Sequence, residues 1–360
     1  MKLVFFEDSD YRRLGPLTSV FPSFMLEVGS KRIYEYWSDF TGISEVALFV
    51  RRRVAGLCKW LLNVVEGREV EVNPSELGND VLALNHALLP VRESVELAKK
   101  ILGWPGNVLV YGGEKVLMVK ASASFAESLA DILVQEPSAE LFLNLAEYTR
   151  DIPFPNPPIL RRPADLLSVL AEVLSGEGRI SGEVEENVII DTKRGGVIVE
   201  EEAVIEGFSR LVGPLYIGKG VVVKAGSRLE RVSLSGNSIV SGTFNSCIMG
   251  RYVKADGVRL KNTVSPGYVT MAPFVSTFYG YSVLGYCSSY YPLTALEGDC
   301  EIGRGSEVKG RFTGKLGPFK RYIDGLVEDV AEEDAAKRLR EILGVFGRLP
   351  SDYELLPLRK

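Results

Sequence analysis

The sequence predicts an α/β domain followed by a parallel β-helix and a C-terminal helix. Three observations predict this order. Short apolar runs alternate with helix-patterned segments over the first 150 residues, prolines crowd residues 153–158, and an aliphatic residue then recurs at every sixth position. Alternating strands and helices are typical of a wound α/β sheet, and a short fixed repeat is typical of a solenoid. We expect domains at 1–158, 159–183 (a linker helix), 184–316 and 317–360.

The composition is that of an ordinary globular protein, with 46% hydrophobic and 25% charged residues in a chain of 360. A net charge of −5 argues against a general nucleic-acid binder, which needs a basic face. The N-terminus becomes acidic too early for a signal peptide, and no apolar run approaches the ~18 residues of a membrane span. Four scattered cysteines without a C-x-x-C spacing predict neither a zinc site nor disulfides. We therefore expect a cytoplasmic protein with no membrane or nucleic-acid partner.

The first domain is expected to carry several strands and helices in alternation. The strands are predicted at 2–6, 45–50 and 81–84, with a hairpin at 108–111 and 115–119. An amphipathic segment starts at 33–37, and helices are predicted at 54–65, 94–102, 126–134 and 139–148. Ligands of wound α/β sheets bind at the carboxyl ends of the strands. Glu7 and Asp8, which follow the first strand, and Asn85, which follows the third, should therefore lie near any site.

Several residues at these strand ends are candidates for binding. Glu7 and Asp8 offer oxygen ligands for Mg²⁺, but neighbours in a strand point to opposite sides, so at most one is well aimed. Asp8 is our metal candidate. Arg12 and Arg13 are the candidates for contacting triphosphate oxygens. Asn85 has two open interpretations, a hydrogen bond to a base or ribose and a turn cap.

Other polar residues of this half have plainer interpretations beside their functional ones. Thr18 is a nucleotide-binding candidate that also fits a role in shaping the turn after Gly15-Pro16. His86 is expected to be a partly exposed loop residue. The run Arg51–Arg53 is the densest basic spot, and we interpret it as a solvated strand end rather than a phosphate site.

The β-helix is predicted from a strict period of six between Val199 and Leu229. Period six matches neither a strand nor an α-helix, and three sixes make one coil whose aliphatic residues stack inward. The first positions of the sixes are Val199, Ile205, Leu211, Ile217, Val223 and Leu229. After Leu229 the sixes lose phase. The aromatic stretch 279–291 fits core and surface packing better than a stacking platform, and 318–346 is expected to be a helix that caps the solenoid.

Several motifs occur in an order that resembles one enzyme family. They are Phe6-Glu7-Asp8 with Gly15-Pro16-Leu17-Thr18, then Val28-Gly29, Leu84-Asn85 with Leu88-Leu89-Pro90, Arg162-Pro163-Ala164-Asp165-Leu166, Asp191 with Lys193-Arg194-Gly195-Gly196, and Gly213-Pro214-Leu215-Tyr216-Ile217-Gly218. Together they resemble the bifunctional N-acetylglucosamine-1-phosphate uridyltransferase / glucosamine-1-phosphate acetyltransferase enzymes, and in particular their divergent sugar nucleotidyltransferase branch.

The resemblance implies a nucleotidyltransferase-like, Rossmann-type α/β domain and a left-handed β-helix of hexapeptide repeats. It also implies a nucleoside triphosphate and a sugar 1-phosphate as substrates, Mg²⁺ as cofactor and a homotrimer formed through the β-helix. Three arginines of the branch are replaced here, by Phe21, Glu27 and Ala87. Since phosphoryl-type transfer relies on cations around the developing charge, these replacements weaken the expectation of turnover.

This chain also lacks the general base that the acyltransferase half of the family uses. Relatives carry a Lys and then a His that acts as general base, whereas this chain has Tyr252, Lys254 and Asp256, and its one His is His86. A carboxylate of ordinary pKa is a poor base for an amine at neutral pH. These three residues stay candidates for an acyltransferase groove, with coil-edge surface residues as the other interpretation.

Three functions follow. The first is a sugar-1-phosphate nucleotidyltransferase in which Arg12, Arg13 or the run Arg51–Arg53 supplies the missing positive charge. The second is a non-catalytic trimeric scaffold or regulatory relative. The third is an acyltransferase of the hexapeptide-repeat class without a His base. We favour the first.

Overall fold

The computed structural model describes the chain except for residues 136, 138–140, 143–147, 177 and 359–360. It divides into two compact units. The first comprises residues 1–14, 21–25 and 32–161, and the second comprises 15–20, 26–31 and 162–360. Two short segments of the early chain therefore belong to the same unit as the C-terminal half, which the sequence pattern does not predict.

The first unit is built on a seven-stranded sheet of order β5-β4-β1-β6-β8-β7-β9. Its strands are β1 (Lys2–Phe6), β4 (Val46–Phe49), β5 (Val70–Val72), β6 (Val81–Asn85), β7 (Val108–Gly112), β8 (Lys115–Ala121) and β9 (Arg150–Pro153). Strands β5, β4, β1 and β6 are parallel, and β8 runs antiparallel to both of its neighbours. The predicted strands and the hairpin are confirmed.

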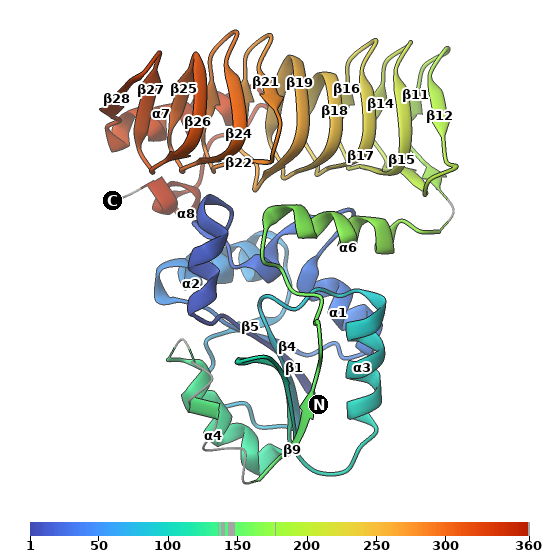
Figure 1. The fold of residues 1–360 in the computed structure, drawn as a ribbon, viewed down its shortest axis with the longest axis vertical. Helices are drawn as coiled ribbons and strands as arrows, with labels where there is room; N and C mark the ends of the chain where they lie inside the picture. Colours follow the sequence, from blue (N-terminus) through green and yellow to red (C-terminus); the bar gives the residue numbers. More distant parts are fainter. Residues whose placement is uncertain (136, 138–140, 143–147, 177, 359–360) are drawn as a thin grey trace. The chain divides into compact units, whose positions relative to one another are not determined.

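Helices cover both faces of this sheet (Figure 1). They are α1 (Ile33–Thr41), α2 (Arg52–Lys59) with a π-helical continuation (Trp60–Val65), α3 (Arg92–Leu102) and α4 (Ala123–Leu133). On one face Phe5 packs against Phe24 and against Tyr34 of α1. On the other face Val4 and Phe6 share a core with α4. Most of the predicted helix 139–148 lies outside the described residues.

The second unit is a left-handed β-helix (Figure 1). Its strands are β10 (Arg179–Ile180), β11 (Glu183–Val184), β12 (Ile189–Asp191), β13 (Val197–Val199), β14 (Val204–Ile205), β15 (Arg210–Ile217), β16 (Val222–Val223), β17 (Arg228–Leu234), β18 (Ile239–Met249), β19 (Val253–Ser265), β20 (Val269–Met271), β21 (Ser276–Phe278), β22 (Ser282–Leu284), β23 (Ser289–Tyr290), β24 (Ala295–Ile302), β25 (Glu307–Lys309), β26 (Arg311–Leu316), β27 (Lys320–Ile323) and β28 (Leu326–Asp329).

The register explains why the sixes are visible only in part of the β-helix. Leu211 pairs with Leu229, which stands three sixes further along the chain. Later coils have other lengths. Leu229 pairs with Phe244, which is nearer than three sixes, and Met271 pairs with Tyr290, which is farther than three sixes. Because the corners shorten or lengthen while the inward-facing positions stay in register, the sequence loses its period although the solenoid continues.

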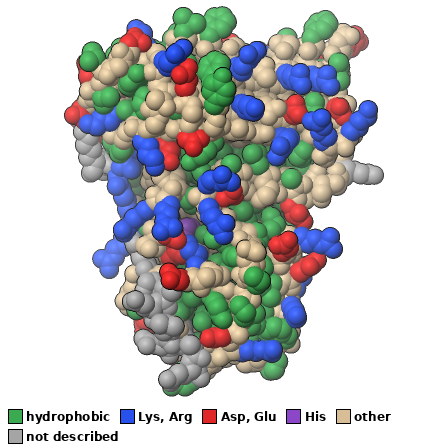
Figure 2. Space-filling model, in the orientation of Figure 1, with side chains coloured by type: hydrophobic (Ala, Val, Ile, Leu, Met, Phe, Trp, Pro, Cys, Tyr) green, Lys and Arg blue, Asp and Glu red, His purple; other side chains and the backbone are tan. Residues whose placement is uncertain are grey.

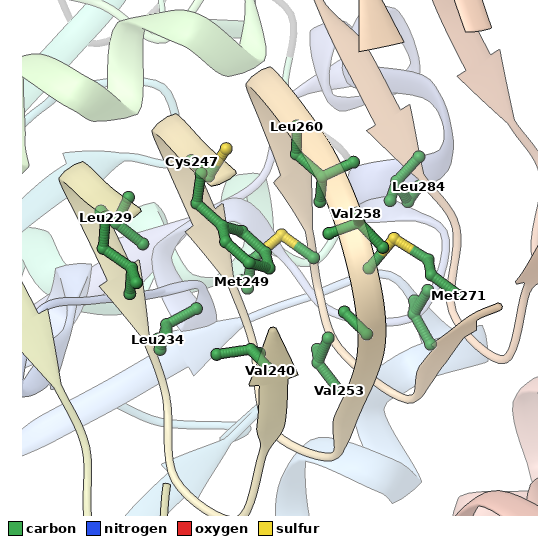
Figure 3. Close-up of a cluster of buried hydrophobic side chains, with 14 of the residues drawn as sticks. Leu229, Leu234, Val240, Cys247, Met249, Val253, Val258, Leu260, Met271 and Leu284 are labelled. Carbon is green, nitrogen blue, oxygen red and sulfur yellow. The ribbon is translucent and has the colours of Figure 1, made fainter. Parts of the chain in front are cut away.

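The interior of the β-helix is a column of stacked apolar side chains. In its middle coils these point inward from successive strands, with the sulfur atoms of Cys247 and Met249 among them (Figure 3). Gly242 shows how tightly the coils stack there. Its φ is +117°, and a Cβ at this position would lie 2.1 Å from the carbonyl oxygen of Val258. Only glycine fits this corner.

Short elements complete the second unit. A 3₁₀ turn (Pro163–Asp165) leads into α6 (Leu166–Val173), which packs against β15, β17 and β18. The segment 26–31 contributes β2 (Glu27–Val28), which pairs with β3 (Lys31–Arg32) and contacts α6. Asp165 accepts a hydrogen bond from the backbone N–H of Arg162 at 2.8 Å and so caps this helical segment.

The predicted C-terminal helix is correct only in its second part. Residues 320–323 and 326–329 form the antiparallel hairpin β27–β28 instead, and α7 runs from Glu332 to Gly344. The hairpin forms because Asp324 and Gly325, both with positive φ, make a tight turn, and because β27 continues the ladder of β25. A short α8 (Asp352–Leu355) follows. Helix α7 lies beside the last coils (Figure 1).

Candidate functional site

The candidate site lies at the carboxyl ends of β1 and β6. Strand β1 is the point where the order of the sheet reverses, because the chain passes from β1 to β4 and β5 on one side and places β6 on the other. Open α/β sheets bind ligands at such a switch point. Glu7 and Asp8 directly follow β1, and Asn85 and His86 stand at the end of β6. The structure thus brings three of the predicted residues to one edge of the sheet.

Asp8 is the centre of this cluster. Its Oδ1 lies 2.9 Å from His86 Nε2 and accepts the backbone N–H of Asp10 at 2.9 Å. Its Oδ2 accepts Asn85 Nδ2 at 2.7 Å and lies 3.0 Å from Lys115 Nζ. Burial alone would raise the pKa of Asp8, but the hydrogen bond and charge of His86 and the charge of Lys115 hold this pKa well below its usual range.

His86 differs from its prediction as a partly exposed residue, because its side chain is buried. Ser23 Oγ lies 2.9 Å from His86 Nδ1 and donates to the His86 carbonyl oxygen at 2.7 Å. Ser23, His86 and Asp8 therefore form a serine–histidine–aspartate chain. Ser23 is completely buried, so its hydroxyl cannot attack a substrate, and the chain holds Asp8 in place.

Lys115 is the residue that sequence reasoning missed. It is the first residue of β8, whose antiparallel direction brings that end of the strand to the same edge as the end of β1. Its Nζ bridges Asp8 Oδ2 at 3.0 Å and Asp10 Oδ2 at 2.9 Å. The sequence contained a signal for Lys115 in the predicted hairpin around Gly112-Gly113. A hairpin keeps the end of its first strand and the start of its second strand at the same edge of the sheet, and Lys115 starts the second strand.

Glu7, the residue before Asp8, has a different side-chain partner. It pairs with Arg51, whose backbone N–H also donates to Glu7 Oε2 at 3.1 Å. The Arg51 guanidinium lies 4.4 Å from the centre of the Tyr11 ring. Burial raises the pKa of Glu7, and the charge of Arg51 offsets only part of this effect. The interpretation of the run Arg51–Arg53 as a solvated strand end is therefore wrong for Arg51, whose side chain is buried, while its two neighbours are exposed.

The two predicted triphosphate-binding arginines are on the surface of the loop after β1. Arg12 lies over the Tyr11 ring at 5.6 Å, and Arg13 Nε lies 3.2 Å from Asp10 Oδ1. Both side chains are exposed. Thr18 is instead part of the second unit, is buried, and donates to the carbonyl oxygen of Gly15 at 3.4 Å. Its contact within the turn matches the turn-shaping interpretation.

The donor set around Asp8 does not fit Mg²⁺ in this structure. Both carboxylate oxygens already accept protein donors, and one of these is an ammonium group that would repel a divalent cation. Glu7 is likewise engaged by Arg51. Among the residues that the structure describes, no three His, Cys, Asp or Glu side chains are grouped so as to hold a metal ion. The metal role predicted for Asp8 is therefore not supported by its surroundings.

Two of the three positions that lost an arginine are accounted for by their contacts. Glu27 belongs to the second unit, and its carboxylate is bound by Arg251, with Nη2 at 2.8 Å and Nε at 2.9 Å from Oε1. Ala87 is buried, and its backbone N–H donates to Asn85 Oδ1 at 2.9 Å. It thereby fixes the amide of Asn85, which presents its nitrogen to Asp8.

The acyltransferase-groove candidates differ in their surroundings. Tyr252 contacts Tyr268 and Phe346, with ring centres 5.0 and 5.5 Å away, and its hydroxyl accepts Arg348 Nη1 at 3.1 Å. Lys254 and Asp256 are exposed on β19, and Asp256 accepts a hydrogen bond from Ser241 at 3.0 Å. Tyr252 therefore serves to attach the C-terminal segment.

The aromatic stretch 279–291 takes part in the same attachment. The rings of Tyr286 and Tyr268 pack with their centres 4.7 Å apart and their planes tilted by 47°. The Tyr286 hydroxyl donates to the Glu354 carbonyl oxygen at 3.0 Å, and the Tyr268 hydroxyl donates to Glu354 Oε1 at 2.8 Å. Burial raises the pKa of both tyrosines well above its usual value, and the Glu354 carboxylate adds to this. Buried packing, rather than a ligand platform, is thus the role of Tyr286.

The surface drawn in Figure 2 does not single out a further binding site. The face drawn in Figure 2 mixes basic, acidic and hydrophobic side chains over the β-helix. Among the described residues, no helix is both long and apolar enough to cross a bilayer.

The first half of the chain matches the model of a known protein family. The family model described as sugar nucleotidyl transferase matches residues 3–178, just under half of the 360 residues. No curated protein matches the chain. The match covers the seven-stranded sheet, the candidate site and α6. The resemblance to a sugar nucleotidyltransferase family is supported, whereas the bifunctional branch within it stays a prediction. The first half of the chain is therefore a nucleotidyltransferase-like domain, similar to the sugar nucleotidyl transferase family.

Proposed function

We propose that this protein is a sugar-1-phosphate nucleotidyltransferase, which joins a nucleoside triphosphate to a sugar 1-phosphate and releases pyrophosphate. One observation carries the proposal. The segment that matches the sugar nucleotidyl transferase family has its charged cluster at the switch point of the sheet, where such a domain binds its ligand.

This reaction requires positive charge near the phosphates more than it requires a nucleophilic side chain of the protein. A phosphate oxygen of the sugar phosphate attacks the α-phosphorus, the bond from this phosphorus to the bridging oxygen breaks, and pyrophosphate leaves. Cations near the phosphates stabilise the charge that develops. Arg12 and Arg13 are exposed on the loop after β1, and Lys115 stands at the same edge. We assign phosphate contacts to these three residues, with Asn85 positioning Asp8.

We further propose a homotrimer formed through the β-helix and a cytoplasmic location. The trimer is suggested by the resemblance, and two exposed apolar side chains at the same corner of successive coils support it. Phe274 and Leu293 are 66% and 72% exposed, and they stand at the same register because Ser276 pairs with Ala295. Exposed apolar residues that share one surface are typical of an interface. A trimeric mass in light scattering over a wide concentration range is expected, and a monomeric mass throughout would contradict it.

A second candidate is a non-catalytic scaffold or regulatory relative. The observation that favours it is the saturation of Asp8 by protein donors, together with the lost arginines at Phe21 and Ala87. The acyltransferase alternative is less well supported, because Tyr252 is packed against Phe346 and Arg348.

Calorimetry separates the first two candidates. UTP, dTTP, GTP, CTP and ATP are titrated into the protein, each with and without a panel of sugar 1-phosphates. The transferase proposal expects micromolar binding of one nucleotide that one sugar phosphate strengthens. Absence of binding across the panel, from protein that is folded and oligomeric, would favour the scaffold.

A further inference from the structure

A side chain of the protein lies against Asp8, the residue that we predicted from the sequence to bind Mg²⁺. Lys115 Nζ lies 3.0 Å from Asp8 Oδ2 and 2.9 Å from Asp10 Oδ2, so its positive charge bridges the two carboxylates. The side chain is largely buried, at 16% exposed. The ion pair of Lys115 with Asp8 is therefore largely buried, unlike an exposed surface ion pair.

The remaining acceptor directions of Asp8 are filled as well. His86 and the backbone N–H of Asp10 contact Oδ1, and Asn85 contacts Oδ2 beside Lys115. Each partner is itself held. Ser23 contacts the far side of the His86 ring, and the side-chain oxygen of Asn85 accepts the Ala87 N–H at 2.9 Å. A metal ion could reach Asp8 only by displacing several fixed donors.

We propose that the Lys115 ammonium replaces a divalent cation at this edge, and that it contributes its charge to binding the phosphates of the nucleotide. An ammonium group has three N–H donors. Two are directed to Asp8 and Asp10, and the third is available to a phosphate oxygen. Asp8 and Asp10 then position Lys115, as they would position a metal ion. This inference rests on the proposed function for its phosphate ligand, but its claim about metal exclusion does not.

The claim about metal exclusion is tested with Mn²⁺ alone, followed by the loss of its free electron-paramagnetic-resonance signal. The wild-type protein is compared with Lys115→Met, Lys115→Arg and Asp8→Asn. We expect Lys115→Met to bind Mn²⁺ at least tenfold more tightly than the wild type, because it removes the ammonium group that bridges Asp8 and Asp10 and repels a divalent cation, and Lys115→Arg to behave as the wild type. Equal binding by the wild type and Lys115→Met, or tight wild-type binding that Asp8→Asn removes, would overturn the proposal.

The claim about phosphate binding is tested with the nucleotide that calorimetry selects. Lys115→Met is expected to lower its affinity at least tenfold in EDTA as well as in Mg²⁺. Lys120→Met is the matched control, because Lys120 is on the same strand at the opposite edge and donates to backbone carbonyls there. Unchanged affinity in Lys115→Met would overturn this part. If no nucleotide binds even to the wild type, the proposed function fails, while the Mn²⁺ comparison still decides whether Lys115 excludes a metal ion.

Both tests need folded variants, and the tryptophans provide the check. All three, Trp37, Trp60 and Trp104, are in the first unit, so their fluorescence reports the fold of the domain that carries Lys115. Lys115→Arg keeps the charge and serves as the second variant if Lys115→Met is unstable. Its affinity for nucleotide should then stay within about threefold of the wild type, and a tenfold loss would contradict a role for the charge.

Discussion

Arg251 binds the carboxylate of Glu27 with two of its nitrogen atoms, Nη2 and Nε, at 2.8 and 2.9 Å from Oε1. The two residues are 224 positions apart in the sequence and belong to the same structural unit. The resemblance puts Glu27 where relatives carry an arginine. The negative charge that this replacement introduces is therefore paired within the unit.

The pair predicts how the segment 26–31 is held on the β-helix. Arg251→Ala should increase amide hydrogen exchange in this segment, because it removes the ion pair with Glu27. The Gly29 N–H bond to Ser233 Oγ, at 2.9 Å, stays in place and limits the effect. Arg251 is 47% exposed, so a cost of at most about 1 kcal/mol is expected. Mass spectrometry of the peptide that contains residues 26–31 measures the exchange. Arg259→Ala, an exposed arginine on β19, is the control and should leave exchange unchanged; equal protection in both variants would contradict the role of the pair.

Asp8→Asn should destabilise the first unit by about 2–4 kcal/mol at pH 7, because it removes the buried counter-charge of Lys115 and the carboxylate oxygen beside the buried His86 ring. Urea unfolding followed by tryptophan fluorescence reports this unit alone. A loss below about 0.5 kcal/mol, on the order of an exposed pair, would show that the cluster is not a stabilising network.

The same variant predicts a pH dependence. The folded-state pKa of Asp8 lies below its ordinary value of about 3.9, so its carboxylate contributes fully above pH ~5. This contribution is lost as the pH falls through the ordinary value toward the lower folded pKa. The difference in unfolding free energy between wild type and Asp8→Asn should therefore shrink as the pH falls below 4. A difference that grows on acidification would have the wrong sign.

Arg12→Ala/Arg13→Ala should weaken nucleotide binding at least tenfold if these arginines contact the phosphates, since a hydrogen bond to a charged group contributes about 1.5–3 kcal/mol. Calorimetry measures the affinity. Lys99→Ala/Lys100→Ala removes the same charge from the C-terminal end of α3, at the opposite edge of the sheet. Equal affinities in both double variants would refute the assignment of Arg12 and Arg13.

Glu354 should control the attachment of the C-terminal segment. It is buried and binds Arg348, with Oε1 at 2.8 Å, as well as the Tyr268 hydroxyl. Glu354→Gln leaves Arg348 without its counter-charge, so local opening becomes easier and trypsin should cleave after Arg348 at least tenfold faster. Glu341→Gln, exposed on α7, is the control. Cleavage at the wild-type rate in Glu354→Gln would show that the segment is held elsewhere.

The architecture follows from the sequence where local patterns are strong. Strands β1, β4 and β6 have continuous apolar runs that end in polar residues, and the sixes from Val199 to Leu229 match coils that are each built from three sixes. The pattern fails where tertiary contacts decide. Residues 320–329 continue a sheet ladder rather than a helix because β25 offers them a partner, which no local property reveals.

The switch-point rule predicted only the site residues that follow parallel strands. Glu7, Asp8 and Asn85 meet as this rule requires. Lys115 was missed although the predicted hairpin returns it to the same edge, and His86 was misjudged because its burial depends on Ser23, far earlier in the chain. The pairing of Glu27 with Arg251 likewise cannot be inferred from the sequence, since nothing local joins them.

Release of pyrophosphate tests the central claim most directly. The wild-type protein is incubated with each nucleoside triphosphate and each sugar 1-phosphate, and pyrophosphate is measured together with the nucleotide-sugar. We predict that one pair yields both products in equal amounts, and that Arg12→Ala/Arg13→Ala yields at least tenfold less. Folded protein that forms no pyrophosphate from any pair would contradict the assignment as a sugar-1-phosphate nucleotidyltransferase.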